Sequence, residues 1–328
     1  DYKNVAEVIR QALQGEKVVL YGHQEQIDID RLPRHISGFG ASSYLKIAEG
    51  CDNRCSYCII PALRGRYRSR RMSDILEEAK ELSKNGIKEV NIIAQDITRY
   101  GIDLYNSFEL SALLKELTKI EGIEWIRLLY SYPDEFNDEL IEVIAKEDKI
   151  CKYLDIPIQH SSNSILKKMV RRSSREKIIR LIEKLRKRIP NIVLRTTLIV
   201  GFPGETENDF KDLYDFVSEV KFNRLGVFAY SREEDTTAYD MPNQIEEAIK
   251  QERLEKIMLL QKDISLKYNK SLVGHTLKVL VEGVSDNGYF GRSFMDAPEI
   301  DGKVYFRSDK NIIPGDFCHI TVKKAYEY

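Results

Sequence analysis

Residues 49–58 read EGCDNRCSYC, and the rest of the chain must be organised around this stretch. It holds three of the five cysteines, Cys51, Cys55 and Cys58, in the spacing C-x3-C-x2-C. The apolar run 44–48 before it predicts a strand. Three thiolates in one loop suit a soft metal centre, and they can hold three irons of a four-iron, four-sulfur cluster while the fourth iron stays open. An open iron can coordinate a substrate or cofactor.

Two other interpretations of these cysteines remain open. A structural zinc site normally needs four ligands, and the nearest histidine, His35, lies sixteen residues upstream of Cys51. Three buried free thiols are the second alternative. A disulfide framework does not fit, because only five cysteines occur in a long chain that is 31% charged. Cys151 and Cys318 lie far apart in sequence, and each is interpreted as a small buried hydrophobic residue.

The composition bounds the class of protein. A length of 328 residues suffices for one large or two medium domains, and a formal net charge of -1 gives no argument for nucleic-acid binding. The sequence contains no apolar run of membrane-spanning length and does not begin with a secretory signal. Sparse, clustered cysteines favour a reducing compartment, so we expect a cytoplasmic protein. We also expect a monomer with no membrane partner. Because the chain begins at Asp1, we expect a fragment of a longer protein.

From residue 44 the sequence alternates between strand and helix patterns. The expected strands are 44–48, 88–94, 125–130, 152–156, 192–199 and 222–229. The expected helices are 73–85, 108–120, 137–147, 162–188 (as two helices), 206–220 and 244–271. Ser73 is expected to cap the first helix, and Thr206 with Asp209 has the spacing of a capping box. This alternation predicts parallel strands in an open, partial (α/β)6 barrel with functional groups at the carboxyl ends of its strands.

The two ends of the chain do not follow this strand–helix alternation. Residues 5–13 predict a helix, 17–21 a short strand and 22–43 a linker. The last 55 residues are rich in Val, Gly and Tyr with regular turn signals, which predicts a small antiparallel β-barrel of the oligonucleotide-binding kind. The expected division is a linker remnant (1–41), a partial barrel (42–271) and a small β-barrel (272–328).

The cysteine spacing resembles the signature of the radical S-adenosylmethionine (SAM) enzymes, with Tyr57 in the aromatic slot before the last cysteine. The flanks YLKIAEGC (44–51) and IIPALRG (59–65) are similar to those of the methylthiotransferases, which insert a methylthio group into a carbon–hydrogen bond. The resemblance implies a TIM-like partial barrel followed by a TRAM domain. GRSFMDAPEIDG (291–302) resembles the branch that modifies an aspartate of the twelfth small-subunit ribosomal protein.

The predicted strand ends supply candidates for binding SAM, which needs polar partners for its ribose, a counter-charge for its carboxylate and an apolar wall for adenine. The candidates are Tyr57, Gln95, Ser131, Gln159, Arg195 and Phe228. Arg195 is the expected carboxylate partner, because a guanidinium can bind a carboxylate through two hydrogen bonds. Ordinary capping of strand ends is the alternative for each of them. His160 also follows a strand, and no catalytic residue is assigned beyond the cluster ligands.

The charge of the carboxyl-terminal region distinguishes between tRNA and a ribosomal protein as substrate. Residues 272–328 carry seven basic and eight acidic side chains, which disfavours tRNA and favours a basic ribosomal protein. Five arginines stand between Arg64 and Arg71, and their expected role is a solvated loop, a clamp for an acidic segment or a contact with another domain. The basic run from Lys167 to Arg180 is interpreted as a solvated outer helix face.

The resemblance implies that SAM serves both as methyl donor and as radical source, with an external electron donor. The family's second four-iron, four-sulfur cluster, with three further cysteines in an amino-terminal domain, has no counterpart in this sequence. The nearest rival function is tRNA adenosine methylthiotransferase. A rival of another class is a nucleic-acid-binding protein with a zinc-stabilised loop.

Overall fold

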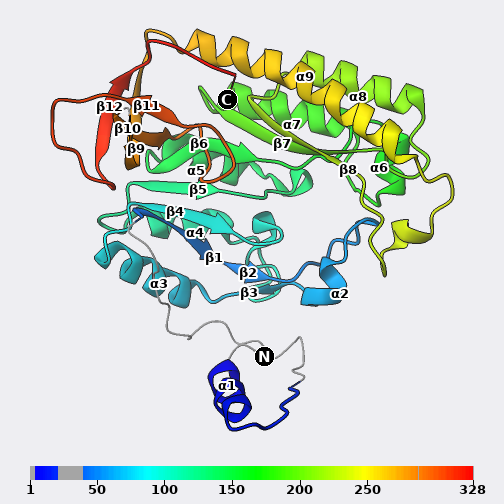
Figure 1. Ribbon diagram of the computed structural model, residues 1–328, viewed down its shortest axis with the longest axis horizontal. Coiled ribbons are helices and arrows are strands. Elements are labelled where there is room, and N and C mark those ends of the chain that lie inside the picture. The colour runs from blue at the N-terminus through cyan, green and yellow to red at the C-terminus, as the bar shows by residue number, and fades with distance from the viewer. Residues whose placement is uncertain (1–3, 21–39, 287, 328) are drawn as a thin grey trace.

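A computed structural model describes residues 4–20, 40–286 and 288–327. Its centre is a six-stranded parallel sheet in the order β1-β4-β5-β6-β7-β8 (Figure 1). The strands are β1 Ser42–Lys46, β4 Glu89–Ile93, β5 Trp125–Leu128, β6 Ile150–Asp155, β7 Val193–Val200 and β8 Arg224–Ala229. All six correspond to the apolar runs of the sequence, and the predicted α/β class is confirmed.

Helices follow the strands in turn. They are α3 Met72–Lys84, α4 Leu110–Thr118, α5 Asp138–Lys146, α6 Asn163–Lys168, α7 Arg175–Arg188, α8 Glu207–Val220 and α9 Glu247–Ser271. The capping box of Thr206 and Asp209 at the start of α8 is confirmed. The predicted cap at Ser73 is wrong, because α3 already begins at Met72. The backbone N–H of Met72 donates to the Tyr105 hydroxyl at 2.9 Å, so the helix start has a partner from outside the helix.

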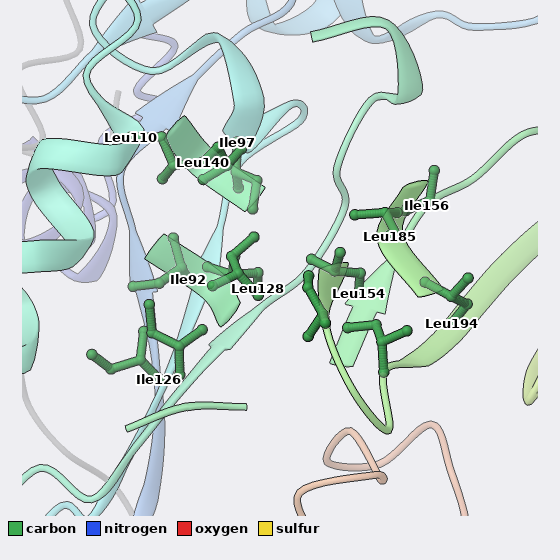
Figure 2. Close-up of a cluster of buried hydrophobic side chains, with 14 of the residues drawn as sticks. Ile92, Ile97, Leu110, Ile126, Leu128, Leu140, Leu154, Ile156, Leu185 and Leu194 are labelled. Atoms are coloured by element: carbon green, nitrogen blue, oxygen red, sulfur yellow. The ribbon is translucent and has the colours of Figure 1, made fainter. Parts of the chain in front are cut away.

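The core lies between the sheet and these helices. Ile92, Ile126, Leu128 and Leu154 alternate along three neighbouring strands and contact side chains from the covering helices (Figure 2). Each of them is fully or almost fully buried. Burying one such side chain stabilises the fold by about 1.5–3 kcal/mol. The three central strands β4, β5 and β6 are therefore buried along most of their length, whereas β8 at the edge is half-buried.

A second, antiparallel sheet has the order β11-β10-β9-β12 and curls into a half-barrel. Its strands are β9 Thr276–Ser285, β10 Gly288–Ser293, β11 Val304–Phe306 and β12 Phe317–Thr321. A Cβ at Gly291 would lie 2.1 Å from the Leu280 carbonyl oxygen, so the bulge after Phe290 requires glycine. Strands β11 and β12 are the edges among the described residues, so the expected barrel is open on one side.

The half-barrel packs against the amino ends of the parallel strands. Trp125, Cys151 and Val193, each at or next to the start of its strand, share a buried cluster with Leu280 and Met295. A polar contact joins the same surfaces, because Lys278 of β9 and Glu124, just before β5, form an ion pair of 3.1 Å. The two sheets therefore form one packed body, with the half-barrel at the end opposite the carboxyl ends of the strands (Figure 1).

The amino-terminal segment matches its predictions only in part. Helix α1 (Val5–Leu13) forms as expected. The predicted strand 17–21 is wrong where it is described, because residues 16–20 have no regular structure and no described strand pairs with them. Most of the predicted linker, 22–39, lies outside the described residues, and 42–43 already belong to β1. No helix in the described part of the chain is both long and apolar enough to cross a membrane.

Candidate active site at the carboxyl ends of the parallel strands

The cysteine loop leaves the sheet just after β1. Strand β2 (Ala48–Glu49) pairs with β3 (Arg68–Ser69), and the loop and helix α2 (Ile60–Arg64) lie between these two short strands. Gly50 has a φ of 79°, and a Cβ there would meet the Arg66 carbonyl oxygen at 2.1 Å. Only glycine fits this backbone position, so the residue before Cys51 is fixed by the conformation of the loop.

The far side of the loop is anchored by Ser56. Its backbone N–H donates to the Met169 carbonyl at 3.1 Å, and its hydroxyl donates to the Lys168 carbonyl at 2.8 Å. Its own carbonyl accepts from Ala238 at 2.7 Å, at the 3-10 helix η5 (Thr237–Asp240). The segment between Cys55 and Cys58 is therefore held against both α6 and the segment that follows β8.

The three thiols interact with one another. Burial raises the pKa of Cys51 to about 11, and the neighbouring Asp96, Cys55 and Cys58 add to the rise. Burial and Cys55 also raise the pKa of Cys58. Thiols of this kind release their protons when a metal binds, and thiolates are the usual ligands of iron–sulfur clusters. In residues 4–20, 40–286 and 288–327 no three His, Cys, Asp or Glu side chains have the arrangement of a metal site, so ligation by the three cysteines stays a prediction.

The other two cysteines lie at the half-barrel. Cys151 is buried in its interface with the parallel sheet, as expected, and burial raises its pKa to about 11. Cys318, in β12, is only partly buried, so its interpretation as a buried residue is wrong. A half-barrel edge strand has solvent on one side.

Three of the predicted SAM residues carry buried polar atoms without partners. They are Oε1 of Gln95, Oγ of Ser131 and Oε1 of Gln159, which follow β4, β5 and β6. The amide nitrogen of Gln95 donates to Glu49 at 3.1 Å, which leaves the oxygen free to accept. Buried polar atoms are almost always hydrogen-bonded in folded proteins. Three unsatisfied ones at neighbouring strand ends therefore fit a polar ligand such as SAM beside the cysteine loop.

The backbone at the same strand ends is strained. Tyr130 and Gln159 have φ values of 64° and 72°, in the left-handed region that non-glycine residues rarely adopt. Gln159 is held there by two hydrogen bonds to β7, from its N–H to the Thr197 carbonyl at 2.9 Å and from Ile199 to its own carbonyl at 2.8 Å. Such strain costs about 1–3 kcal/mol per residue and clusters at functional sites.

Arg195 lies elsewhere than its prediction placed it. It is the third residue of β7, and the strand continues to Val200, so its predicted place at the strand end is wrong. Its guanidinium donates to Asp155 at 2.9 Å and lies 3.8 Å from Asp301 of the carboxyl-terminal region. A SAM carboxylate would compete with these two, so its binding role stays a prediction.

The two aromatic candidates differ in exposure. Tyr57 packs beside Met169 and Phe202 in a small apolar cluster. Phe228, in β8, is 58% exposed and can contact a ligand laid over the sheet edge. Neither contact identifies adenine, so both roles stay predictions.

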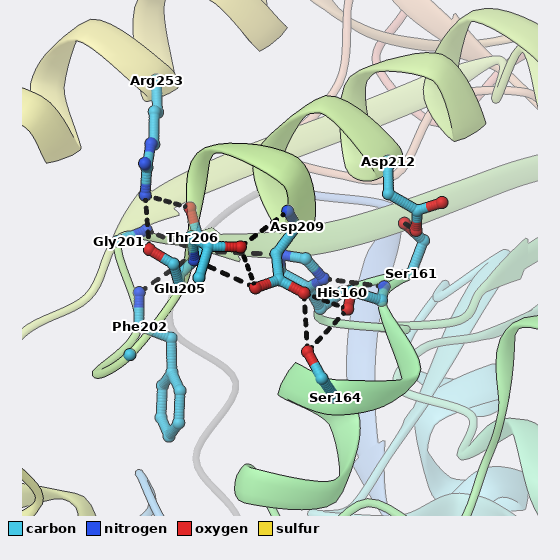
Figure 3. A network of polar contacts seen from close by, with 12 residues as sticks. His160, Ser161, Ser164, Gly201, Phe202, Glu205, Thr206, Asp209, Asp212 and Arg253 are labelled. Atoms are coloured by element: carbon cyan, nitrogen blue, oxygen red, sulfur yellow. Dashed lines mark hydrogen bonds and ion pairs between the residues drawn. The ribbon is translucent and has the colours of Figure 1, made fainter. Parts of the chain in front are cut away.

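His160 belongs to a buried network that ties α6, α8 and α9 together (Figure 3). Its Nδ1 accepts from the Ser162 N–H at 2.9 Å, which requires a neutral ring with the proton on Nε2. That Nε2 lies 3.6 Å from Glu205, whose carboxylate accepts from Gly201 at 2.8 Å and from Arg253 at 2.8 Å. These contacts favour a structural role for His160.

Arginines near the loop are mostly engaged within the protein. Arg66 pairs with Asp52 at 2.7 Å, and Arg70 pairs with Glu78 at 2.6 Å. Sequence reasoning missed one of them altogether, because Arg171 was placed on a solvated face and is instead buried beside Cys55. The turn that follows α6 directs the Arg171 side chain into the protein. This turn contains no glycine, so the sequence gives no sign of it.

Comparisons with known proteins agree with this layout. The sequence model of the Radical SAM superfamily matches residues 45–217, and that of the TRAM domain matches residues 273–328. The chain is 54% identical over all 328 residues to a ribosomal protein uS12 methylthiotransferase RimO of Caldanaerobacter subterraneus, covering 75% of that relative. It is 50% identical to the protein of the same name from Clostridioides difficile, covering 74% of it.

Solved structures resemble the chain more distantly. A radical S-adenosylmethionine methyltransferase from Kitasatospora setae is 20% identical, with a TM-score of 0.49 over 58% of this chain and 34% of that one. Methylornithine synthase is 13% identical, with a TM-score of 0.48 over 67% of this chain and 62% of that one.

Proposed function

The chain belongs to the RimO family of radical SAM methylthiotransferases, and we propose that it takes part in adding a methylthio group to the β-carbon of an aspartate in ribosomal protein uS12. The observation that carries this proposal is the juxtaposition at one sheet edge. An anchored loop with Cys51, Cys55 and Cys58 lies beside strand ends that carry three unsatisfied buried polar atoms.

Different residues would bind the two cofactors, the iron–sulfur cluster and SAM. Cys51, Cys55 and Cys58 would ligate a four-iron, four-sulfur cluster with one open iron, and Gln95, Ser131 and Gln159 would bind the polar groups of SAM. Tyr57 and Phe228 would supply apolar walls, and Arg195 a counter-charge. When bound, the cluster and SAM together supply the radical that removes a hydrogen atom from the substrate carbon. The protein's own task is to orient the substrate carbon and to exclude water.

The remaining assignments belong to the same proposal. Helix α9 ends at Ser271 and the TRAM match begins at residue 273, which supports the division into 1–41, 42–271 and 272–328. The second cluster is assigned to the quarter of the relatives' length that lies outside the match. A cytoplasmic monomer supplied by an external electron donor is expected, and the mildly acidic carboxyl-terminal region favours uS12 over tRNA.

Anaerobic reconstitution tests the proposal. The chain should bind about four irons with matching sulfide and should release 5′-deoxyadenosine from SAM under reduction. Binding of a single zinc without sulfide would instead support the nucleic-acid-binding alternative. Because these 328 residues hold only one group of three close cysteines in sequence, they should not methylthiolate uS12 by themselves. Mass spectrometry of uS12 and of tRNA after incubation with the longer, full-length protein then identifies the substrate.

A further inference from the structure

Arg171 is a buried cation next to the cysteine loop. Its side chain is only 8% exposed and makes three contacts. One guanidinium nitrogen donates to the Cys55 sulfur at 3.9 Å, and another donates to the Pro157 carbonyl at 2.7 Å. The guanidinium carbon Cζ also lies 4.0 Å from the centre of the Tyr132 ring.

The turn that follows α6 directs this side chain inward. Arg171 N–H donates to the Leu166 carbonyl at 2.9 Å, and Val170 N–H donates to the Lys167 carbonyl at 3.1 Å. This pair of bonds is the Schellman motif, whose left-handed residue is usually glycine. Here it is Val170, with a φ of 56°. A β-branched residue is strained in that conformation. The strained residue lies where the chain turns, and this turn points the Arg171 side chain into the interior instead of along the helix surface.

The charge of Arg171 has no carboxylate partner among the described residues. Its neighbours there are a carbonyl, an aromatic ring and a thiol, and its Nε has no hydrogen-bond partner. The adjacent Arg172 differs, because it pairs with Glu135 at 2.7 Å and its side chain is 49% exposed. A buried cation is costly unless a negative group compensates it. Of the groups that the guanidinium contacts, the one that becomes negative when a metal binds is the sulfur of Cys55.

We propose that Arg171 is a positioning residue that raises the reduction potential of the iron–sulfur centre ligated by Cys55. This inference rests on the proposed function. Hydrogen bonds to cluster sulfurs and nearby positive charge stabilise the reduced, more negative form of the centre. Pro157 and Tyr132 hold the guanidinium against the sulfur, so its charge acts at a fixed place and without a competing carboxylate.

The test is a redox titration of the reconstituted protein, followed by electron paramagnetic resonance. Arg171→Gln keeps a hydrogen-bond donor, on a shorter side chain, but removes the charge. At a fixed solution potential its ratio of reduced to oxidised centre should fall about tenfold, equivalent to about 59 mV for one electron. Arg171→Lys keeps the charge and should stay closer to the wild type. Arg172→Gln is the matched control, because it faces the same ring without contacting the sulfur, and its ratio should not change.

Each outcome decides the matter. An unchanged ratio in an iron-loaded Arg171→Gln protein would overturn the role of Arg171 and leave the proposed function intact. An equal loss in the Gln and Lys variants would assign the effect to packing and also overturn it. If Arg171→Gln binds no iron, Arg171→Lys decides, since a tenfold loss there refutes a role for the charge and a ratio near wild type supports it. Failure of the wild-type chain to bind a cluster would overturn both proposals.

Discussion

Removing the Glu89 carboxylate should weaken the packing of the half-barrel on the parallel sheet. Glu89, the first residue of β4, is fully buried and accepts from Arg127 Nε at 2.9 Å. It also accepts from two nitrogens of Arg292, at 2.5 and 3.3 Å, although Arg292 lies 203 residues further along the chain. Arg127 in turn donates to the Phe294 carbonyl at 2.7 Å. The carboxylate is therefore the common partner of one arginine from each sheet.

The size of the stability loss depends on which carboxylate partners Arg127 and Arg292 retain. Breaking a buried ion pair from one side costs about 3–5 kcal/mol, because the remaining charge stays buried without compensation. In Glu89→Ala, Arg292 still pairs with Glu282 at 2.5 Å, so only Arg127 loses its carboxylate. We therefore expect the low end of that range, a loss of about 3 kcal/mol in the free energy of unfolding.

Urea denaturation followed by circular dichroism and by Trp125 fluorescence measures this loss, since the single tryptophan lies in the interface. Glu81→Ala is the control, because its pair with Lys84 is solvent-exposed and its removal should not shift the midpoint. The double variant Glu89→Leu/Arg127→Met should recover most of the stability. A loss below about 1 kcal/mol in Glu89→Ala, within the range of an exposed pair, would refute the reasoning.

The same carboxylate predicts a pH dependence. Burial alone would raise the pKa of Glu89, but Arg127 and Arg292 hold it below its ordinary value of 4.5. The unfolded state therefore binds the proton more readily than the folded state. The stabilisation is complete above pH 4.5 and is lost as the pH falls through the lower, folded-state pKa. Glu89→Ala should show a shallower loss of stability in that acidic range than the wild type.

Three further predictions concern the cysteine loop and its surroundings. Replacing any one of Cys51, Cys55 and Cys58 with Ala should abolish cluster binding, while Cys151→Ala should not, and a full iron and sulfide content in Cys55→Ala would contradict the ligand assignment. Gly50→Ala should cost about 1–3 kcal/mol from backbone strain and should lower iron loading, because its Cβ would lie 2.1 Å from a carbonyl oxygen. Arg195→Ala should weaken SAM binding by about 1.5–3 kcal/mol, and an unchanged affinity by calorimetry on the reconstituted protein would remove Arg195 from the site.

Local sequence signals predicted the elements well where burial alone determines them. Runs such as 88–94 and 192–199 were predicted as strands, because they are rich in Val, Ile and other apolar residues and are too short for helices. The capping box at Thr206 needs only four consecutive residues, and it formed as predicted. Signals of this kind depend on near neighbours, so a single sequence contains them.

Other features depend on partners distant in sequence. Strand β2 is two residues long and exists because β3 pairs with it some twenty residues later. Arg171 was assigned to a solvated face because its neighbours are basic. The left-handed backbone of Val170 instead directs the Arg171 side chain into the interior. Arg195 was expected at a strand end, yet it is the third residue of β7, and its guanidinium is held by Asp155, forty residues earlier. The partner of a polar side chain inside a strand depends on the neighbouring strands, which the local sequence does not contain.

The position of the half-barrel constrains how it can serve the reaction. It covers the amino ends of β5, β6 and β7, whereas the cysteine loop follows the carboxyl end of β1. One link to the site runs through Asp301, because Asp301 and Asp155 share the guanidinium of Arg195. The carbonyl of Asp155 accepts from the Ser131 N–H at 2.8 Å, next to one of the unsatisfied polar atoms. Through Asp301 and Arg195, the carboxyl-terminal region therefore helps to hold the end of β6, which lies next to the candidate site.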